Sequence, residues 1–119
     1  MLGDPQNPLS THVFYFAYDS SDISVADRDA ISAHAEFLAT HPEISLVIEG
    51  HADERGTREY NLALGERRAM TIDRLIKVQG AADSQIQLVS FGEERPVALG
   101  HDEQAWSLNR RVELLYSGY

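Results

Sequence analysis

One arginine of this sequence stands among the apolar residues of a predicted helix. Hydrophobic periodicity predicts that helix from about residue 59 to residue 78. At about 100° per residue, Arg68 lies on the same side of the helix as Leu64 and Leu75. Because a guanidinium keeps its charge, burying it without a partner costs several kcal/mol. Arg68 therefore requires an anionic partner, whereas Arg67 lies at the edge of the apolar side and can face solvent.

Two kinds of anion could meet Arg68. Asp53 or Asp19, at the ends of neighbouring predicted strands, could supply an internal carboxylate, and that salt bridge would fasten the helix to the sheet. A ligand could also bring the carboxylate, and both arrangements can hold at once. Asn61 adds amide donors in the first helical turn, where free backbone N–H groups favour anions. One carboxylate beside one guanidinium complements a zwitterion, such as the α-amino acid group of a free amino acid or of an uncrosslinked peptide end.

Few residues could indicate an enzyme or a metal protein. His51, Asp53 and Glu54 lie together, but no other histidines have a spacing that would complete a zinc site. Neighbouring carboxylates in a loop rarely face each other as glycosidase chemistry requires. The sequence contains no nucleophile elbow, phosphate loop or zinc-protease helix. We therefore expect no enzymatic activity, no metal and no cofactor. Trp106 could stack on a sugar, although residues of this kind, like His34, more often belong to the core.

The elements that must position these residues alternate along the chain. The predicted elements are strands at 12–18, 44–49, 86–91 and 111–116, helices at 24–40 and 59–78, and a short helical turn at 104–108. This β-α-β-α-β-(short α)-β order predicts an α/β (α+β) sandwich, with a mixed four-stranded sheet and helices on one face. Ligands of such sheets bind beyond the carboxyl ends of parallel strands, here at residues 18–19 and 50–58.

Length and composition favour one domain. The 119 residues suffice for a single core. Residues 1–10 contain two prolines and no apolar period, so we expect a flexible N-terminal tail before a domain at 11–119. A formal net charge of -9 argues against nucleic acid as a partner. Because cysteines, a signal peptide and a membrane-spanning apolar stretch are absent, we expect an excised soluble domain.

Short motifs spread over most of the chain carry a family resemblance. They are residues 18–19, 49–57, 59–61, 64–69, 89–92, 96, 99–103 and 109–112. On these motifs the sequence resembles the OmpA-like domain family, and within it the peptidoglycan-associated lipoproteins of Gram-negative envelopes. It departs from the common family pattern at Tyr18, Ala52 and Arg58, where many members have Phe, Thr and Pro.

The resemblance implies a ligand and a set of site residues. The ligand is the diaminopimelate residue of uncrosslinked peptidoglycan stem peptide, bound non-covalently with Asp53 and Arg68 as principal anchors. Supporting contacts are implied for Tyr18, Asp19, Arg55, Asn61 and Leu64, with Asn109 and Arg111 bracketing the site.

The resemblance also implies a place in the cell. It suggests a monomeric periplasmic domain that tethers the outer membrane to the wall through a lipid anchor upstream of this chain, with TolB as a second partner in the Tol-Pal system. The alternative is the wall-anchoring domain of a flagellar stator or of an outer-membrane porin.

Overall fold

The computed structural model describes residues 8–118, and their elements follow the predicted order closely. They are η1 (Pro8–Ser10), β1 (Val13–Tyr15), α1 (Val25–Thr40), β2 (Ser45–His51), α2 (Arg58–Val78), η2 (Asp83–Gln85), β3 (Ile86–Gly92), α3 (Glu103–Asn109) and β4 (Arg111–Ser117).

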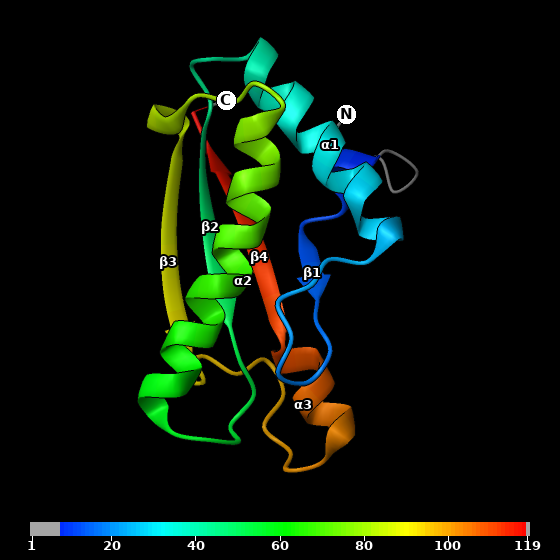
Figure 1. The fold of residues 1–119 in the computed structure, drawn as a ribbon, viewed down its shortest axis with the longest axis vertical. Helices are drawn as coiled ribbons and strands as arrows, with labels where there is room; N and C mark the ends of the chain where they lie inside the picture. The colour runs from blue at the N-terminus through cyan, green and yellow to red at the C-terminus, as the bar shows by residue number, and fades with distance from the viewer. Residues whose placement is uncertain (1–7, 119) are drawn as a thin grey trace.

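The strands form one mixed sheet in the order β1-β4-β2-β3. β2 and β3 are parallel, whereas β4 is antiparallel to both β2 and β1. Figure 1 shows α1 and α2 in front of the same face of the sheet, with α3 at the end where β2 finishes. The predicted mixed four-stranded sheet with helices on one face is confirmed.

The two longer helices begin at side-chain caps that are visible in the sequence. The Ser24 hydroxyl accepts a hydrogen bond from the backbone N–H of Asp27 at 3.2 Å, at the residue where the first helix was predicted to begin. The Thr57 hydroxyl accepts from the N–H of Tyr60 at 3.1 Å, so α2 begins one residue earlier than predicted. Gly80 follows α2 with a φ of 121°, the left-handed conformation expected where the helix ends.

The apolar core lies between the sheet and the two longer helices. Its most deeply buried members come from all of these layers: Phe14, Ile31, Leu38, Leu46, Ile48, Ile72, Ile76 and Leu114. Burying a side chain of this size contributes about 1.5–3 kcal/mol. The core therefore fixes where α2 begins relative to the strand ends, and so where the polar residues of its first turns lie.

α2 approaches β2 closely at two glycines. A Cβ atom on Gly50 would lie 1.8 Å from the carbonyl oxygen of Gly65, so no larger residue fits there without moving the helix. A Cβ atom on Gly65 would lie 2.4 Å from the Ser90 hydroxyl. This contact holds the first half of α2 against the end of β2.

The N-terminal part of the chain differs most from the prediction. β1 covers only Val13–Tyr15, rather than residues 12–18, because the chain turns away from β4 after the bond from the N–H of Phe16 to the carbonyl of Arg110. Of the predicted tail, residues 1–7 lie outside the described part. Pro8–Ser10 form a short 3-10 turn that packs against α1.

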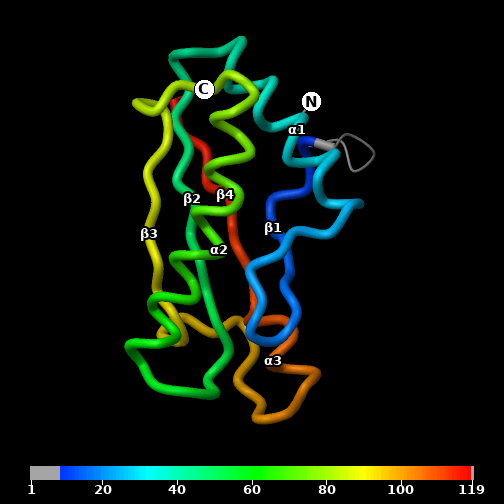
Figure 2. The backbone as a smooth tube through the Cα atoms, viewed as in Figure 1, coloured from blue at the N-terminus to red at the C-terminus, as the bar shows by residue number. Residues whose placement is uncertain are grey.

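Figure 2 shows where the loops lead. The loops that follow β1 and β2 reach the same end of the molecule as α3, whereas β4 runs from that end to the opposite one. The segments predicted to hold the ligand therefore meet at one end of the sheet.

Candidate functional site

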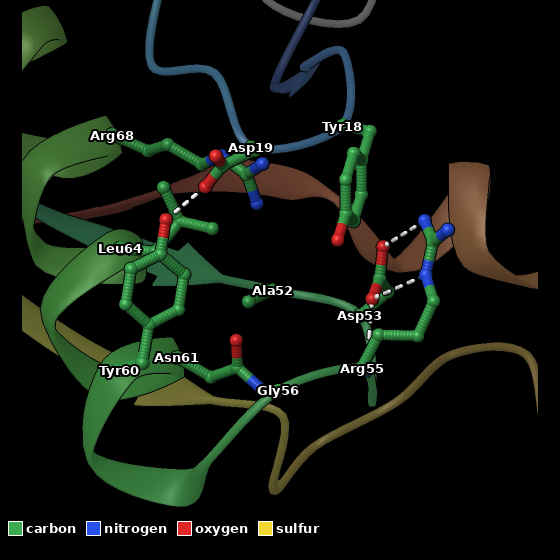
Figure 3. A pocket seen from close by; sticks show the side chains of 10 residues that line it. All are labelled: Tyr18, Asp19, Ala52, Asp53, Arg55, Gly56, Tyr60, Asn61, Leu64 and Arg68. Atoms are coloured by element: carbon green, nitrogen blue, oxygen red, sulfur yellow. Dashed lines mark hydrogen bonds and ion pairs between the residues drawn. The ribbon is translucent and has the colours of Figure 1, made fainter.

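A small pocket opens between the loop after β1, the loop after β2 and the first turns of α2 (Figure 3). Its cavity is about 60 Å³, and its lining residues are Tyr18, Asp19, Ala52, Asp53, Arg55, Gly56, Tyr60, Asn61, Leu64 and Arg68. Apart from the two bracketing residues, Asn109 and Arg111, all of the predicted site residues therefore line one cavity, at the strand ends where the sequence placed it. Asn109 instead accepts hydrogen bonds from the backbone N–H groups of Val97 and Ala98.

Arg68 is fully buried, and its hydrogen-bond acceptors are backbone carbonyls. Its Nε donates to the carbonyl of Ser20 at 2.7 Å, one Nη to that of His51 at 2.8 Å, and the other Nη to that of Ala17 at 3.2 Å. Of the two alternatives left open by the sequence, an internal carboxylate does not contact Arg68, because these carbonyls occupy the place of the acid.

Within residues 8–118, this arrangement leaves the charged guanidinium of Arg68 without a contacting carboxylate. Burial lowers the pKa of Arg68 to about 10, against the opposing effect of the Asp53 carboxylate, so the guanidinium stays protonated at neutral pH. A guanidinium also carries more N–H donors than these three bonds use. Arg68 thus offers positive charge and free donors to an anion entering the pocket.

The carboxylate of Asp53 is held by two arginines. Arg55 donates to it from the backbone N–H at 3.0 Å, from Nε at 3.2 Å and from an Nη at 2.8 Å, and an Nη of Arg110 lies 3.5 Å away. Burial alone would raise the pKa of Asp53, but these hydrogen bonds outweigh it and lower the pKa below the ordinary aspartate value. Asp53 is therefore a buried, ionised acceptor beside the cavity.

Arg110 is a residue that the sequence argument did not select. Its side chain is only 6% exposed, and its Nε donates to the carbonyl of Phe16 at 2.8 Å. Its two Nη atoms meet the Glu103 carboxylate at 3.2 and 2.8 Å, at the start of α3. Arg110 therefore joins β1, α3 and Asp53.

Arg111 does not line the cavity, and its place as a bracket for the site stays a prediction. Its guanidinium donates to Glu113 at 2.5 Å and to the carbonyl of Arg95 at 3.0 Å, so it holds the loop after β3. Neighbouring residues of a strand point to opposite faces. Val112 is buried in the core, so its neighbour Arg111 points to the other face of the sheet, whereas Arg110 lies two residues from Val112 on the same side. This alternation is the signal that would have selected Arg110 instead of Arg111.

Arg55 is stacked between two aromatic rings beside Asp53. Its Cζ lies 4.1 Å from the centre of the Tyr18 ring and 4.0 Å from that of Trp106. The Trp106 indole N–H donates to Glu54 at 2.8 Å, and His101 Nδ1 lies 2.7 Å from the same carboxylate. Trp106 therefore packs against the Arg55 guanidinium and does not belong to the core.

Asp19 and Tyr60 form the opposite side of the mouth. The Tyr60 hydroxyl donates to the Asp19 carboxylate, as the dashed line in Figure 3 marks. Asp19 has a φ of 53°, in the left-handed region that aspartate adopts more readily than most other non-glycine residues. Tyr60 belongs to one of the family motifs, but its role was not predicted, because its contact with Asp19 joins the first turn of α2 to a loop distant in the sequence.

Asn61 and Leu64 line the floor in different ways. The Asn61 amide donates to Glu93 at 2.7 Å, so one of its predicted donors is already used. Leu64 is 6% exposed and supplies an apolar surface together with Ala52. Arg58, which departs from the family pattern, pairs with Glu94 at 2.6 Å and does not line the cavity.

The two histidines considered in the sequence lie outside the cavity. The His51 ring stacks on Phe91 at 5.6 Å, and only its carbonyl reaches the site. His34 bonds the Tyr116 hydroxyl at 2.6 Å and the carbonyl of Thr11 at 2.8 Å, which confirms that it is a packed histidine. Within residues 8–118 no group of His, Cys, Asp or Glu side chains forms a metal site.

Comparison with known proteins decides the family. The model of the OmpA family matches residues 15–110. The chain belongs to the OmpA family. The domain is 56% identical over 113 residues to the peptidoglycan-associated lipoprotein of Pseudomonas aeruginosa, covering 95% of this chain and 67% of that protein. It is 47% identical over 112 residues to that of Legionella pneumophila, covering 94% of this chain and 61% of that protein.

Solved structures agree with this assignment. The crystal structure of the peptidoglycan-associated lipoprotein from Burkholderia pseudomallei matches with a TM-score of 0.93 and 45% identity, over 98% of each chain. The C-terminal domain of Helicobacter pylori MotB matches with a TM-score of 0.80, but at 21% identity that likeness shows the fold alone.

These comparisons confirm the family resemblance and the fold. The names of the relatives describe association with peptidoglycan and no reaction, which supports the prediction that the OmpA-family domain is not an enzyme. The chain spans about 60 to 67% of the length of the curated relatives in Pseudomonas and Legionella. None of the helices in residues 8–118 combines the length and apolar character needed to cross a bilayer.

Proposed function

We propose that the domain binds the uncrosslinked stem peptide of peptidoglycan at the pocket between the loops after β1 and β2. The observation that carries this proposal is the buried guanidinium of Arg68, which lines a small cavity without a contacting carboxylate. An ionised carboxylate, Asp53, lines the same cavity. The two charges suit the two ends of a zwitterionic amino acid group.

Each group of the ligand has a matching group in the pocket. The carboxylate of the free end of diaminopimelate accepts hydrogen bonds from Arg68, and its ammonium donates to Asp53 and Asp19. The methylene chain lies against the apolar surface of Leu64 and Ala52. Lysine ends in an ammonium alone, so a lysine-containing stem peptide leaves Arg68 without a partner.

The walls of the pocket are already held in place before the ligand arrives. Arg55 is fixed by two hydrogen bonds from its side chain to Asp53 and by the rings on either side of it. Arg68 is fixed by two carbonyls of the loop after β1 and by the carbonyl of His51 at the end of β2. Such preorganisation reduces the ordering cost of binding.

The wider role follows from the relatives. Proteins named peptidoglycan-associated lipoprotein are 43 to 56% identical to this domain, so we place the full-length protein in the periplasm, anchored to the outer membrane by a lipid upstream. In that setting, binding of stem peptide ties the outer membrane to the wall. TolB as a second partner and a monomeric state belong to the same proposal. The stator alternative rests on the fold alone.

Titration with matched peptides tests the proposal. A stem peptide that contains diaminopimelate should bind more tightly than the same peptide with lysine, and Arg68→Ala should abolish the difference, because only diaminopimelate brings a carboxylate to Arg68. Asp53→Ala should weaken binding of both peptides, since both carry the ammonium. Arg68→Ala should weaken binding by about 2–5 kcal/mol, the usual effect of removing one partner of a buried charge pair. Thermal melting of each variant separates lost binding from lost folding. Equal affinity of the folded variants and the native domain for both peptides would refute the proposal.

A further inference from the structure

A second groove lies along α2, beside the pocket. It has a volume of about 140 Å³, and its lining residues are Ser21, Arg67, Met70, Thr71 and Arg74. No acidic side chain lines it, although the sequence carries a formal net charge of -9. The groove is therefore a local cationic site on an acidic protein.

The two arginines of the groove are free to bind an anion. Both are exposed, and within residues 8–118 neither makes an ion pair with a carboxylate. Arg67 and Arg74 are seven residues apart on one helix, which puts them on the same side at about 10 Å along the axis. Thr71 lies between them and also lines the groove, and its hydroxyl donates to the carbonyl of Arg67 at 3.0 Å.

The groove is adjacent to the proposed stem-peptide pocket. Ser20, whose carbonyl binds Arg68, directly precedes Ser21 in the groove. On the helix side, the Tyr60 ring lines the pocket and lies 5.6 Å from the Cζ of Arg67. A ligand that leaves the pocket over Tyr60 therefore meets Arg67 first and Arg74 next.

We propose that Arg67 and Arg74 form a second anionic subsite for the same stem peptide, an inference that rests on the proposed function. The residue next to diaminopimelate is a glutamate joined through its side-chain carboxyl, which leaves its α-carboxylate free. A carboxylate one residue from the pocket matches a pair of unpaired guanidinium groups beside it. The groove thus makes the domain select stem peptides whose glutamate is not amidated.

The test compares two peptides that differ only in this carboxylate. One carries the free glutamate α-carboxylate and the other its amide, and both carry diaminopimelate. The proteins are the native domain, the double variant Arg67→Gln/Arg74→Gln, and the control Arg58→Gln/Arg95→Gln. The control removes the same charge from exposed arginines outside the groove, since Arg58 pairs with Glu94 and Arg95 stacks on Phe91.

The native domain and the control should prefer the free carboxylate by about fivefold, the effect of roughly one exposed ion pair. The groove variant should bind both peptides equally. The inference is overturned if the native domain does not discriminate, or if the groove variant keeps the native preference. It is also overturned if the groove and control variants lose affinity alike for both peptides. A different result would refute the proposed function itself. In that case the Asp53→Ala variant would bind diaminopimelate peptides with the same affinity as the native domain.

Discussion

At the scale of single residues, burial could be predicted from the sequence but the partners could not. The apolar period of α2 placed Arg68 in the interior, where it is 0% exposed. Its partners depend on a turn in which Asp19 adopts a left-handed conformation and the carbonyls of Ala17 and Ser20 face inward. No residue pattern revealed that turn, so the sequence indicated an anionic partner for Arg68 but not the three carbonyls that bind it.

The pair Arg110 and Arg111 gives a matched residue-scale prediction. Both are almost fully buried, but only Arg110 reaches Asp53. Arg110→Gln should weaken binding of diaminopimelate stem peptide by about tenfold, the value of roughly one hydrogen bond to a charged group. Arg111→Gln should lower the melting temperature but change the affinity by less than about twofold. Calorimetric titration checks the affinities.

The pH dependence of the same variants separates positioning from folding. Arg110 helps to hold the pKa of Asp53 below its ordinary value. Its loss should raise that pKa, so acid should weaken binding at a higher pH in Arg110→Gln than in the native domain. Arg110→Lys, which keeps the charge, should restore part of the native profile. Identical pH profiles for all variants would assign Arg110 a structural role only.

At the scale of elements, the order and most of the boundaries followed from the sequence. The first helix was predicted from its cap at Ser24 and the end of the second from Gly80, whereas the cap at Thr57 was found only in the structure. The pairing of strands did not follow, because the insertion of β4 between β1 and β2 is a long-range choice. The strand β1 was predicted too long, since its apolar run continues into the turn that binds Arg68.

The close contact between α2 and β2 gives an element-scale prediction. Gly65→Ala places a methyl group 2.4 Å from the Ser90 hydroxyl and 2.9 Å from the carbonyl oxygen of Gly50. The helix must shift, so the domain should lose about 1–3 kcal/mol of stability, as overpacked sites do. The first turns of α2 should move with it and weaken stem-peptide binding. Denaturant unfolding and titration measure both effects.

Ala63→Leu, on the exposed side of the same helix, is the control and should change neither stability nor affinity by much. A Gly65→Ala domain as stable as the native one would contradict the packing argument.

At the scale of the whole molecule, two buried histidines link stability to pH. Burial lowers the pKa of His34 and of His51 to about 4, below the ordinary histidine value. The unfolded chain takes up these protons at about pH 6.5, whereas the folded domain does so only near pH 4. Stability should therefore be complete above about pH 6.5 and fall as the pH drops toward 4, by about 3 kcal/mol for each histidine at most.

Unfolding in denaturant between pH 7 and pH 4.5 checks this dependence. His34→Gln should flatten the pH profile and lower stability at pH 7, because it loses the packed ring and its bonds to Thr11 and Tyr116. His41→Gln is the control, since His41 is exposed at the end of α1. A native profile that stays level from pH 7 to pH 4.5 would show that these histidines take up protons without unfolding the domain.

The central claim is that Arg68 receives a ligand carboxylate beside Asp53, and a crystal structure of the domain with a diaminopimelate-containing stem peptide tests it most directly. We expect a carboxylate of the free end within about 3 Å of the Arg68 guanidinium. The ammonium of the same end should contact the Asp53 or Asp19 carboxylate. A peptide bound elsewhere, or one whose carboxylate points to solvent while Arg68 contacts only the carbonyls of Ala17, Ser20 and His51, would contradict the account.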